Sequence, residues 1–188
     1  MTLIRRGSVM LLVLAAAACE SANSQPGNTA GSEGPPPVRV ELIGRDGNRV
    51  GTAVLTEEGH GVRITIEVAG LTPGRRGIHI HETGKCDPPG FETAGAHFDP
   101  LGTRHGIENP NGPHAGDLPN IVVQPDGAGR NSSLNPYVTL GPGPNSLLRE
   151  GGTALVLHAD ADDYYTHPSG NSGERIACGV IQAPANRE

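Results

Sequence analysis

Five of the chain's eight histidines lie in one stretch, between residues 77 and 117, and an aspartate closes that stretch. In chain order these residues are His79, His81, His97, His105, His114 and Asp117. His158 follows later, inside an apolar segment. His79 and His81 are two residues apart, so in a β-strand both imidazoles project from one face. Imidazole nitrogens with one carboxylate suit copper and zinc, whereas magnesium and calcium prefer oxygen ligands. The stretch therefore predicts a metal site.

The segments that must position these side chains are predicted to be β-strands. Apolar and polar residues alternate in the first part of the chain, and strand-like runs recur later, at 38–42, 50–56, 62–68, 77–81, 121–123, 153–159 and 176–181. Turn sequences such as RDGN and QPDGAGR separate several of them, and residues 137–140 read as a short strand or a turn. Because apolar residues do not recur at helical spacing over three turns, we expect an all-β antiparallel sandwich or barrel of about eight strands. Two long loops, 82–118 and 160–175, would carry the function.

Composition limits the size of the fold and the kind of partner. The chain has 188 residues, enough for one domain with a real core. Its 28 glycines and 17 prolines indicate many turns and loops. The formal charge is −6 and no basic stripe runs through the sequence, which argues against a nucleic-acid partner.

The first 19 residues predict export. Arg5 and Arg6 precede an apolar run over 9–18, which is too short to span a bilayer but suits the core of a signal peptide. LAAAAC then ends at Cys19 and is similar to a bacterial lipoprotein processing site, which would make Cys19 the lipidated N-terminus. An ordinary secretory signal cut nearby, with Cys19 incidental, is the alternative. We expect the periplasm or cell envelope as the location, with membrane contact only through the lipid.

Residues 20–37 predict a flexible tether, because they lack apolar periodicity and are rich in Ser, Gly and Pro. The folded domain would then occupy residues 38–188. Cys86 and Cys178 lie inside it, and an even pair of cysteines in an exported protein predicts a disulfide. The bond would tie the histidine-rich loop to the last strand; two buried free thiols are the alternative.

Six segments occur in the order found in one known family: GIHIHETGKC, AGAHFDP, RHG, PHAGDLPN, LVLHADADD and GERIACGVI. From about residue 38 to residue 181 the sequence resembles the secreted bacterial copper,zinc superoxide dismutases. The resemblance implies a Greek-key β-barrel that converts superoxide to dioxygen and hydrogen peroxide. Copper would supply the redox chemistry and zinc would be its structural partner. The reaction would protect the cell envelope from superoxide formed outside the cytoplasm.

The resemblance also implies a role for each residue of the cluster. Four histidines would bind copper: His79, His81, His97 and His158. Four residues would bind zinc: His97, His105, His114 and Asp117. His97 would bridge the two metals and, in the implied mechanism, leave copper(I), take up a proton and deliver it on reoxidation. Arg175 would be the catalytic cation beside the copper, and Asp162 would hydrogen-bond ligand histidines of both metals. Cys86 and Cys178 would form the disulfide within the subunit.

Some features depart from the family pattern. Lys85 is the only lysine, and residues 160–175 carry carboxylates where many members have lysines that attract superoxide. We therefore expect weaker steering, or steering by other arginines. The loop between His81 and His97 lacks an insertion found in some periplasmic relatives. His60 and His167 fit no ligand position and are expected in solvent.

Three other functions compete with superoxide dismutation. The first is a copper-only enzyme of the same family, against which the intact zinc set argues. The second is a domain that binds or delivers copper without turnover, and the third is a lipoprotein stabilised by zinc alone. Quaternary structure differs among bacterial members, and a homodimer is possible.

Overall fold

The structure is a computed structural model that describes residues 35–184. The predicted signal peptide, Cys19 and nearly all of the predicted tether lie outside these residues. Within them, no helix is long and apolar enough to cross a membrane.

Eight strands make up almost all of the regular structure in the described part of the chain. They are β1 (Val38–Gly44), β2 (Arg49–Glu58), β3 (Gly61–Val68), β4 (Gly74–His81), β5 (Asp117–Val123), β6 (Gly129–Asn135), β7 (Thr153–His158) and β8 (Arg175–Ile181). One 3-10 turn, η1 (Glu92–Ala94), lies in the loop between β4 and β5. The predicted all-β class and the two long loops are confirmed.

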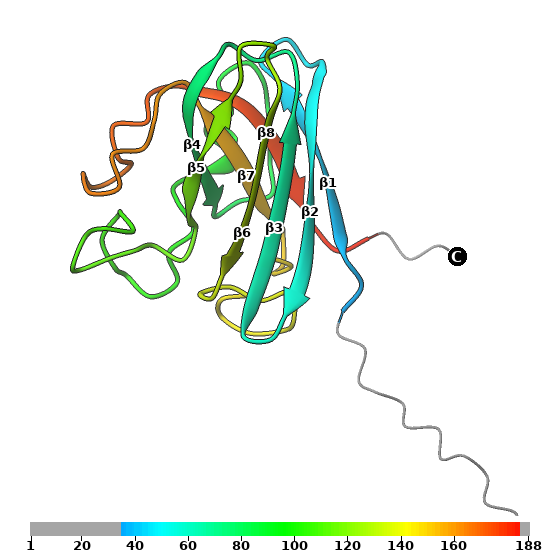
Figure 1. Cartoon of the computed structure of the whole chain (residues 1–188). Helices are drawn as coiled ribbons and strands as arrows, with labels where there is room; N and C mark the ends of the chain where they lie inside the picture. Colours follow the sequence, from blue (N-terminus) through cyan, green and yellow to red (C-terminus); the bar gives the residue numbers. More distant parts are fainter. Residues whose placement is uncertain (1–34, 185–188) are drawn as a thin grey trace, which may run out of the picture. The chain divides into compact units, whose positions relative to one another are not determined.

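The strands close into an antiparallel barrel in the order β1-β2-β3-β6-β5-β4-β7-β8 (Figure 1). The consecutive strands β4, β5 and β6 are neighbours, and β3 returns to pair with β6, which is a Greek key. The two long loops leave the barrel on one side of the view in Figure 1, after β4 and after β7. The topology therefore places both loops over the same part of the sheet.

Alternating apolar residues fill the barrel interior. Val38, Val40 and Leu42 of β1 and Ile64 of β3 are buried in the main core, and each such side chain stabilises the fold by roughly 2 kcal/mol. All six residues of β7 are buried. The outer face of β7 is covered because Phe91 in the first loop packs in a second apolar cluster with Ala94, Ala154, Val156 and Cys178. This packing holds the loop against β7 and β8.

The strand β6 was not predicted from the sequence, and residues 137–140 form no strand. Thr139 makes only an isolated bridge to Ser146. Gly129–Asn135 pairs with β3 along its whole length, yet its less exposed positions carry Gly129, Asn131, Ser133 and Asn135 in place of apolar residues. The sequence of β6 therefore shows no alternation of apolar and polar residues, and the strand is formed through its hydrogen bonds to β3.

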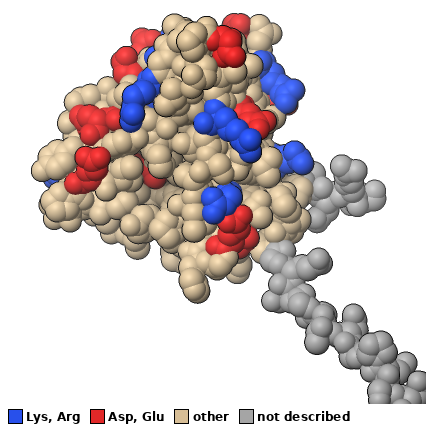
Figure 2. Space-filling view, viewed as in Figure 1, with Lys and Arg blue, Asp and Glu red and all other residues tan. Residues whose placement is uncertain are grey.

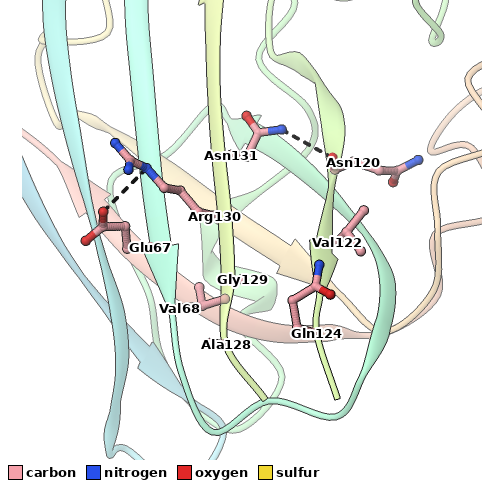
Figure 3. Close-up of a pocket in the computed structure, with 9 residues that line it drawn as sticks. All are labelled: Glu67, Val68, Asn120, Val122, Gln124, Ala128, Gly129, Arg130 and Asn131. Carbon is pink, nitrogen blue, oxygen red and sulfur yellow. Dashed lines mark hydrogen bonds and ion pairs between the residues drawn. The ribbon is translucent and has the colours of Figure 1, made fainter. Parts of the chain in front are cut away.

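The polar character of β6 has a structural reason in a gap beside β5. The two strands pair only at Val123 and Gly129 and then diverge around a 590 Å³ surface hollow (Figure 3). Asn131 Nδ2 crosses the gap and donates to the carbonyl of Asn120 at 3.2 Å. An amide side chain thus replaces part of the missing backbone ladder.

Candidate metal centre

The barrel itself aligns the first histidines. His79 and His81 lie on β4 with buried side chains, while Ile78 and Ile80 point into the main core from the alternate positions. The neighbouring strand β5 begins at Asp117, which pairs with His79 of β4. His158 is the last residue of β7, and an isolated bridge joins His97 to His81. Residues distant in sequence therefore meet at one end of three adjacent strands.

Two groups of buried donor atoms result, and within each group the atoms lie within 4.8 Å of one another. The first group is His79, His81, His97 and His158. The second is His79, His97, His105 and Asp117. His114 borders the second group, with Nδ1 3.5 Å from Asp117 Oδ1. The structure thus brings together all seven side chains that the sequence analysis assigned to the two metals.

Hydrogen bonds fix which nitrogen of each imidazole is free. His81 Nδ1 donates to the Gly95 carbonyl at 2.9 Å, and His158 Nδ1 donates to the Gly173 carbonyl at 3.2 Å. His79 Nε2 donates to Asp162 Oδ2 at 2.8 Å. A carbonyl or carboxylate oxygen accepts the proton, so the other ring nitrogen keeps its lone pair. His79 Nδ1, His81 Nε2 and His158 Nε2 are buried without a partner among the described residues. Buried polar atoms of this kind call for a bound group, and nitrogen lone pairs fit copper.

The second group surrounds one oxygen of Asp117. Its Oδ1 lies 3.1 Å from His97 Nδ1 and 3.0 Å from His105 Nδ1. Its Oδ2 accepts from the backbone N–H groups of Gly106 at 2.8 Å and His114 at 3.0 Å, which orients the carboxylate. Three imidazoles and one carboxylate are a closed tetrahedral set for zinc. His97 presents Nδ1 to this group and is also a member of the first, as a bridging ligand requires.

Asp162 connects the two groups from the second loop. Its Oδ2 accepts from His79 Nε2, and its Oδ1 accepts from His105 Nε2 at 2.9 Å. Gly170 packs over this bond with φ 65°, and a Cβ there would lie 1.8 Å from Asp162 Oδ1. Only glycine allows so close an approach. A partner carboxylate of this kind orients ligand imidazoles.

Asn120 is a functional residue that the sequence analysis missed. Its Nδ2 donates to the Asp162 carbonyl and its Oδ1 accepts the Asp162 N–H, both at 2.9 Å. Tyr164 adds a second tie, because its hydroxyl accepts the Asn120 N–H at 2.8 Å. Asn120 therefore fixes the backbone of the residue that orients His79 and His105. It lies in the PHAGDLPN segment, but nothing in its spacing distinguishes it from other asparagines.

Arg175 reaches across from β8 into the first loop. Its Nη1 donates to the Phe91 carbonyl at 2.6 Å and its Nη2 to the Gly95 carbonyl at 2.7 Å. Both acceptor residues have positive φ, 58° at Phe91 and 78° at Gly95, a conformation that is sparsely populated by residues other than glycine. Cys86 and Cys178 form the predicted disulfide, which anchors this loop to β8.

Burial keeps the imidazoles of the first group neutral. It lowers the pKa of His79 to about 3, of His81 to about 2 and of His158 to about 4. At His105 burial is outweighed by the carboxylates of Asp117 and Asp162, which raise its pKa to about 9. Neutral imidazoles are the form that binds a metal, so the first group is ready to act as ligands.

The chain matches known proteins over most of its length. The family model for copper/zinc superoxide dismutase matches residues 49–181. The chain belongs to the copper/zinc superoxide dismutase family. It is 52% identical over 145 residues to superoxide dismutase [Cu-Zn] 2 of Aquifex aeolicus, covering 76% of this chain and 85% of the relative.

Solved structures agree with this assignment. A SOD-like protein from Bacillus subtilis superposes with a TM-score of 0.74 at 43% identity, covering 76% of this chain and 97% of its own. The copper/zinc superoxide dismutase of Brucella abortus superposes with a TM-score of 0.64 at 30% identity, covering 78% and 100%. The predicted family is confirmed, and with it an oxidoreductase that uses copper and zinc.

The two remaining histidines, His60 and His167, differ from each other in their contacts. His60 and His167 are both exposed, as expected. His167 nevertheless accepts the backbone N–H of His105 through Nδ1 at 3.1 Å, and its ring centroid lies 5.5 Å from that of His114. The second loop therefore supports the zinc side through a residue that the sequence analysis placed in solvent.

Proposed function

We propose that this chain dismutates superoxide at the first of the two groups, with copper held by His79, His81, His97 and His158. Two superoxide anions and two protons give one dioxygen and one hydrogen peroxide. Copper, when bound, supplies the one-electron couple that the reaction needs, and zinc bound by His97, His105, His114 and Asp117 supplies a fixed structural charge. The observation that carries the proposal is a set of three buried imidazole nitrogens, without a partner within residues 35–184, together with a half-buried arginine.

Two of the chain's own groups would act on the substrate. The Arg175 guanidinium would hold the anion near the first group, because its charge is permanent and two backbone carbonyls fix its orientation. His97 Nε2 would hold and deliver one of the two protons, while Nδ1 keeps the ring on the zinc side. Arg175 and His97 are therefore the proposed catalytic residues.

We further propose that the mature chain is exported and lipidated at Cys19, in the periplasm or cell envelope, where it removes superoxide formed outside the cytoplasm. The apolar run over 9–18, the LAAAAC sequence and the tether over 20–37 support this location. The lipid would be its one attachment to the membrane. A homodimer is the proposed assembly, tested by light scattering of the metal-loaded protein.

The deciding experiment compares residues 20–188 loaded with copper and zinc against the same chain loaded with zinc alone. Superoxide consumption is followed after a pulse, together with the copper content. Fast consumption that requires copper supports the proposal. Full copper occupancy without turnover rejects it and favours a copper-delivery function.

A further inference from the structure

A charged hollow of 250 Å³ borders Arg175 at the surface. Its lining residues come from three segments: Arg45, Gly90, Glu92, Gly173, Glu174 and Arg175. The hollow adjoins the proposed copper side through two backbone contacts. The Gly173 carbonyl holds His158, and the Gly95 carbonyl holds both His81 and Arg175. Arg175 lines the hollow, so a small anion that enters it comes close to this residue and to a segment that holds a proposed copper ligand.

Two carboxylates in this hollow oppose the entry of an anion. Glu92 and Glu174 both line the hollow with Arg175, and the Glu174 side chain is 74% exposed. Without Arg45, these two carboxylates and Arg175 would give the hollow a net charge of −1. One unit charge about 10 Å from a monovalent anion changes its energy by roughly 0.4 kcal/mol in water. That corresponds to about a twofold change in local concentration.

Arg45 neutralises this negative charge. It lies in the turn between β1 and β2, and β1 pairs with β8 through Gly44 and Ala177, which brings the turn beside the start of β8. Its Nη1 donates to Glu174 Oε2. With Arg45 in place, the hollow carries two positive and two negative charges. On the face seen in Figure 2, basic and acidic side chains are interspersed, so no large patch of a single charge dominates that face.

We propose that Arg45 is a positioning residue for the anionic substrate, which neutralises Glu174 and so controls how readily small anions reach Arg175. This inference rests on the proposed function, because superoxide is the anion concerned. Arg45 supplies from the β1–β2 turn the positive charge that the second loop lacks, since residues 160–175 contain four carboxylates and no lysine. An exposed ion pair contributes little to stability, so we expect the protein without Arg45 to stay folded.

Arg49, the first residue of β2, provides a matched control close to the same turn. It is also an exposed arginine in an ion pair, with Nε 3.5 Å from Glu41 Oε1. It does not line the hollow beside Arg175. Removing either arginine changes the net charge of the protein by the same amount, so only a local effect separates R45A from R49A.

The experiment uses the copper- and zinc-loaded protein with R45A, E174Q, the R45A/E174Q pair and R49A. It measures the second-order rate constant with superoxide at low and high salt. At low salt we expect R45A to be about two- to threefold slower and E174Q faster by a similar factor. The double variant, whose hollow is again neutral, is expected to return to the wild-type rate. High salt should remove these differences.

Azide supplies a readout that needs no turnover. Its dissociation constant, measured from the visible absorption of the bound copper, is expected to rise about two- to threefold in R45A and to stay unchanged in R49A. Equal effects of R45A and R49A, or a double variant that behaves like R45A, would overturn the inference. If the wild type consumes no superoxide, the proposed function fails, while azide binding still decides the role of Arg45.

R45K is expected to restore most of the wild-type affinity for azide, and a thermal melt shows whether each variant is folded.

Discussion

Arg175 and His81 share one hydrogen-bond acceptor, the carbonyl oxygen of Gly95. The arginine donates through Nη2 at 2.7 Å and the imidazole donates through Nδ1 at 2.9 Å. A single peptide group therefore fixes both the cation that would meet the substrate and the ring orientation of a proposed copper ligand. Any change that moves this carbonyl acts on both.

Replacing Gly95 by alanine is expected to disturb both partners at once. Gly95 has φ 78°, and a Cβ there would lie 2.8 Å from Glu82 Oε1. The strain is about 1–3 kcal/mol, which the loop would relieve by shifting the carbonyl. We expect lower activity together with an altered copper EPR spectrum. G102A is the control, because Gly102 also has a positive φ of 69° but no atom within 4 Å of its Cβ position. An unchanged spectrum in G95A would contradict the shared-carbonyl argument.

Replacing Arg175 by alanine is expected to separate substrate attraction from metal binding. The guanidinium contacts backbone carbonyls and is not among the metal donor groups. The rate with superoxide is therefore expected to fall at least about tenfold and to lose part of its salt dependence, while bound copper, measured by atomic absorption, stays constant. R175K keeps the charge but not the two-point contact, so an intermediate rate is expected. Wild-type kinetics in R175A would remove the proposed role of this residue.

Replacing Asp162 by asparagine is expected to weaken zinc binding by about 10- to 100-fold. Each oxygen of Asp162 accepts from one ring N–H, of His79 and of His105. An amide has only one oxygen, so its NH₂ group would face the second ring N–H. D163N is the matched control, because Asp163 Oδ1 accepts backbone N–H groups of Tyr165 and Thr166, which an amide oxygen also does. Among the described residues, Asp163 Oδ2 accepts only from the exposed side chain of Asn171, whose amide group is free to turn. Competition with a chelator measures the affinity, and equal zinc affinities for D162N and D163N would contradict the argument.

The clustering of the proposed metal ligands was predictable from the sequence because each is a chemically specific residue at a fixed spacing. His79 and His81 define one face of a strand, and Cys86 and Cys178 are the only two cysteines in residues 38–188. Asn120 and the carbonyl of Gly95 were not predictable in this way. Their roles depend on backbone groups that become neighbours only when the loops fold over β4 and β5. The strand β6 was missed for a related reason, since its pairing with β3 and not its hydropathy determines it.

The disulfide is expected to contribute about 4 kcal/mol to stability. Cys86 and Cys178 are 92 residues apart, and closing a loop of this length restricts the unfolded chain by that order in the chain-entropy model. We expect C86S to lower the melting temperature of the metal-free protein clearly, and a reducing agent to have the same effect on the wild type but none on C86S. A wild-type melting temperature that is unaffected by reduction would count against this contribution.

The stability of the metal-free protein is expected to fall as the pH drops below about 6.5. Burial lowers the pKa of His79 to about 3, of His81 to about 2 and of His158 to about 4, whereas an unfolded histidine titrates near about 6.5. Below that pH the unfolded chain binds more protons than the folded one at these three sites, so the free energy of unfolding decreases with falling pH.

His105 affects the pH dependence of the free energy of unfolding with the opposite sign. Its hydrogen bonds to Asp117 and Asp162 outweigh its burial and raise its pKa to about 9. The stabilisation that His105 provides is already complete below about pH 6.5. It therefore does not offset the decrease in the free energy of unfolding between about pH 6.5 and 5. Urea unfolding at these two pH values measures the effect. Replacing His81 by glutamine is expected to reduce the difference between the two midpoints, whereas the same change at the exposed His60 leaves it intact. A midpoint that is equal or higher at the lower pH would show that these imidazoles are not held neutral in the folded chain.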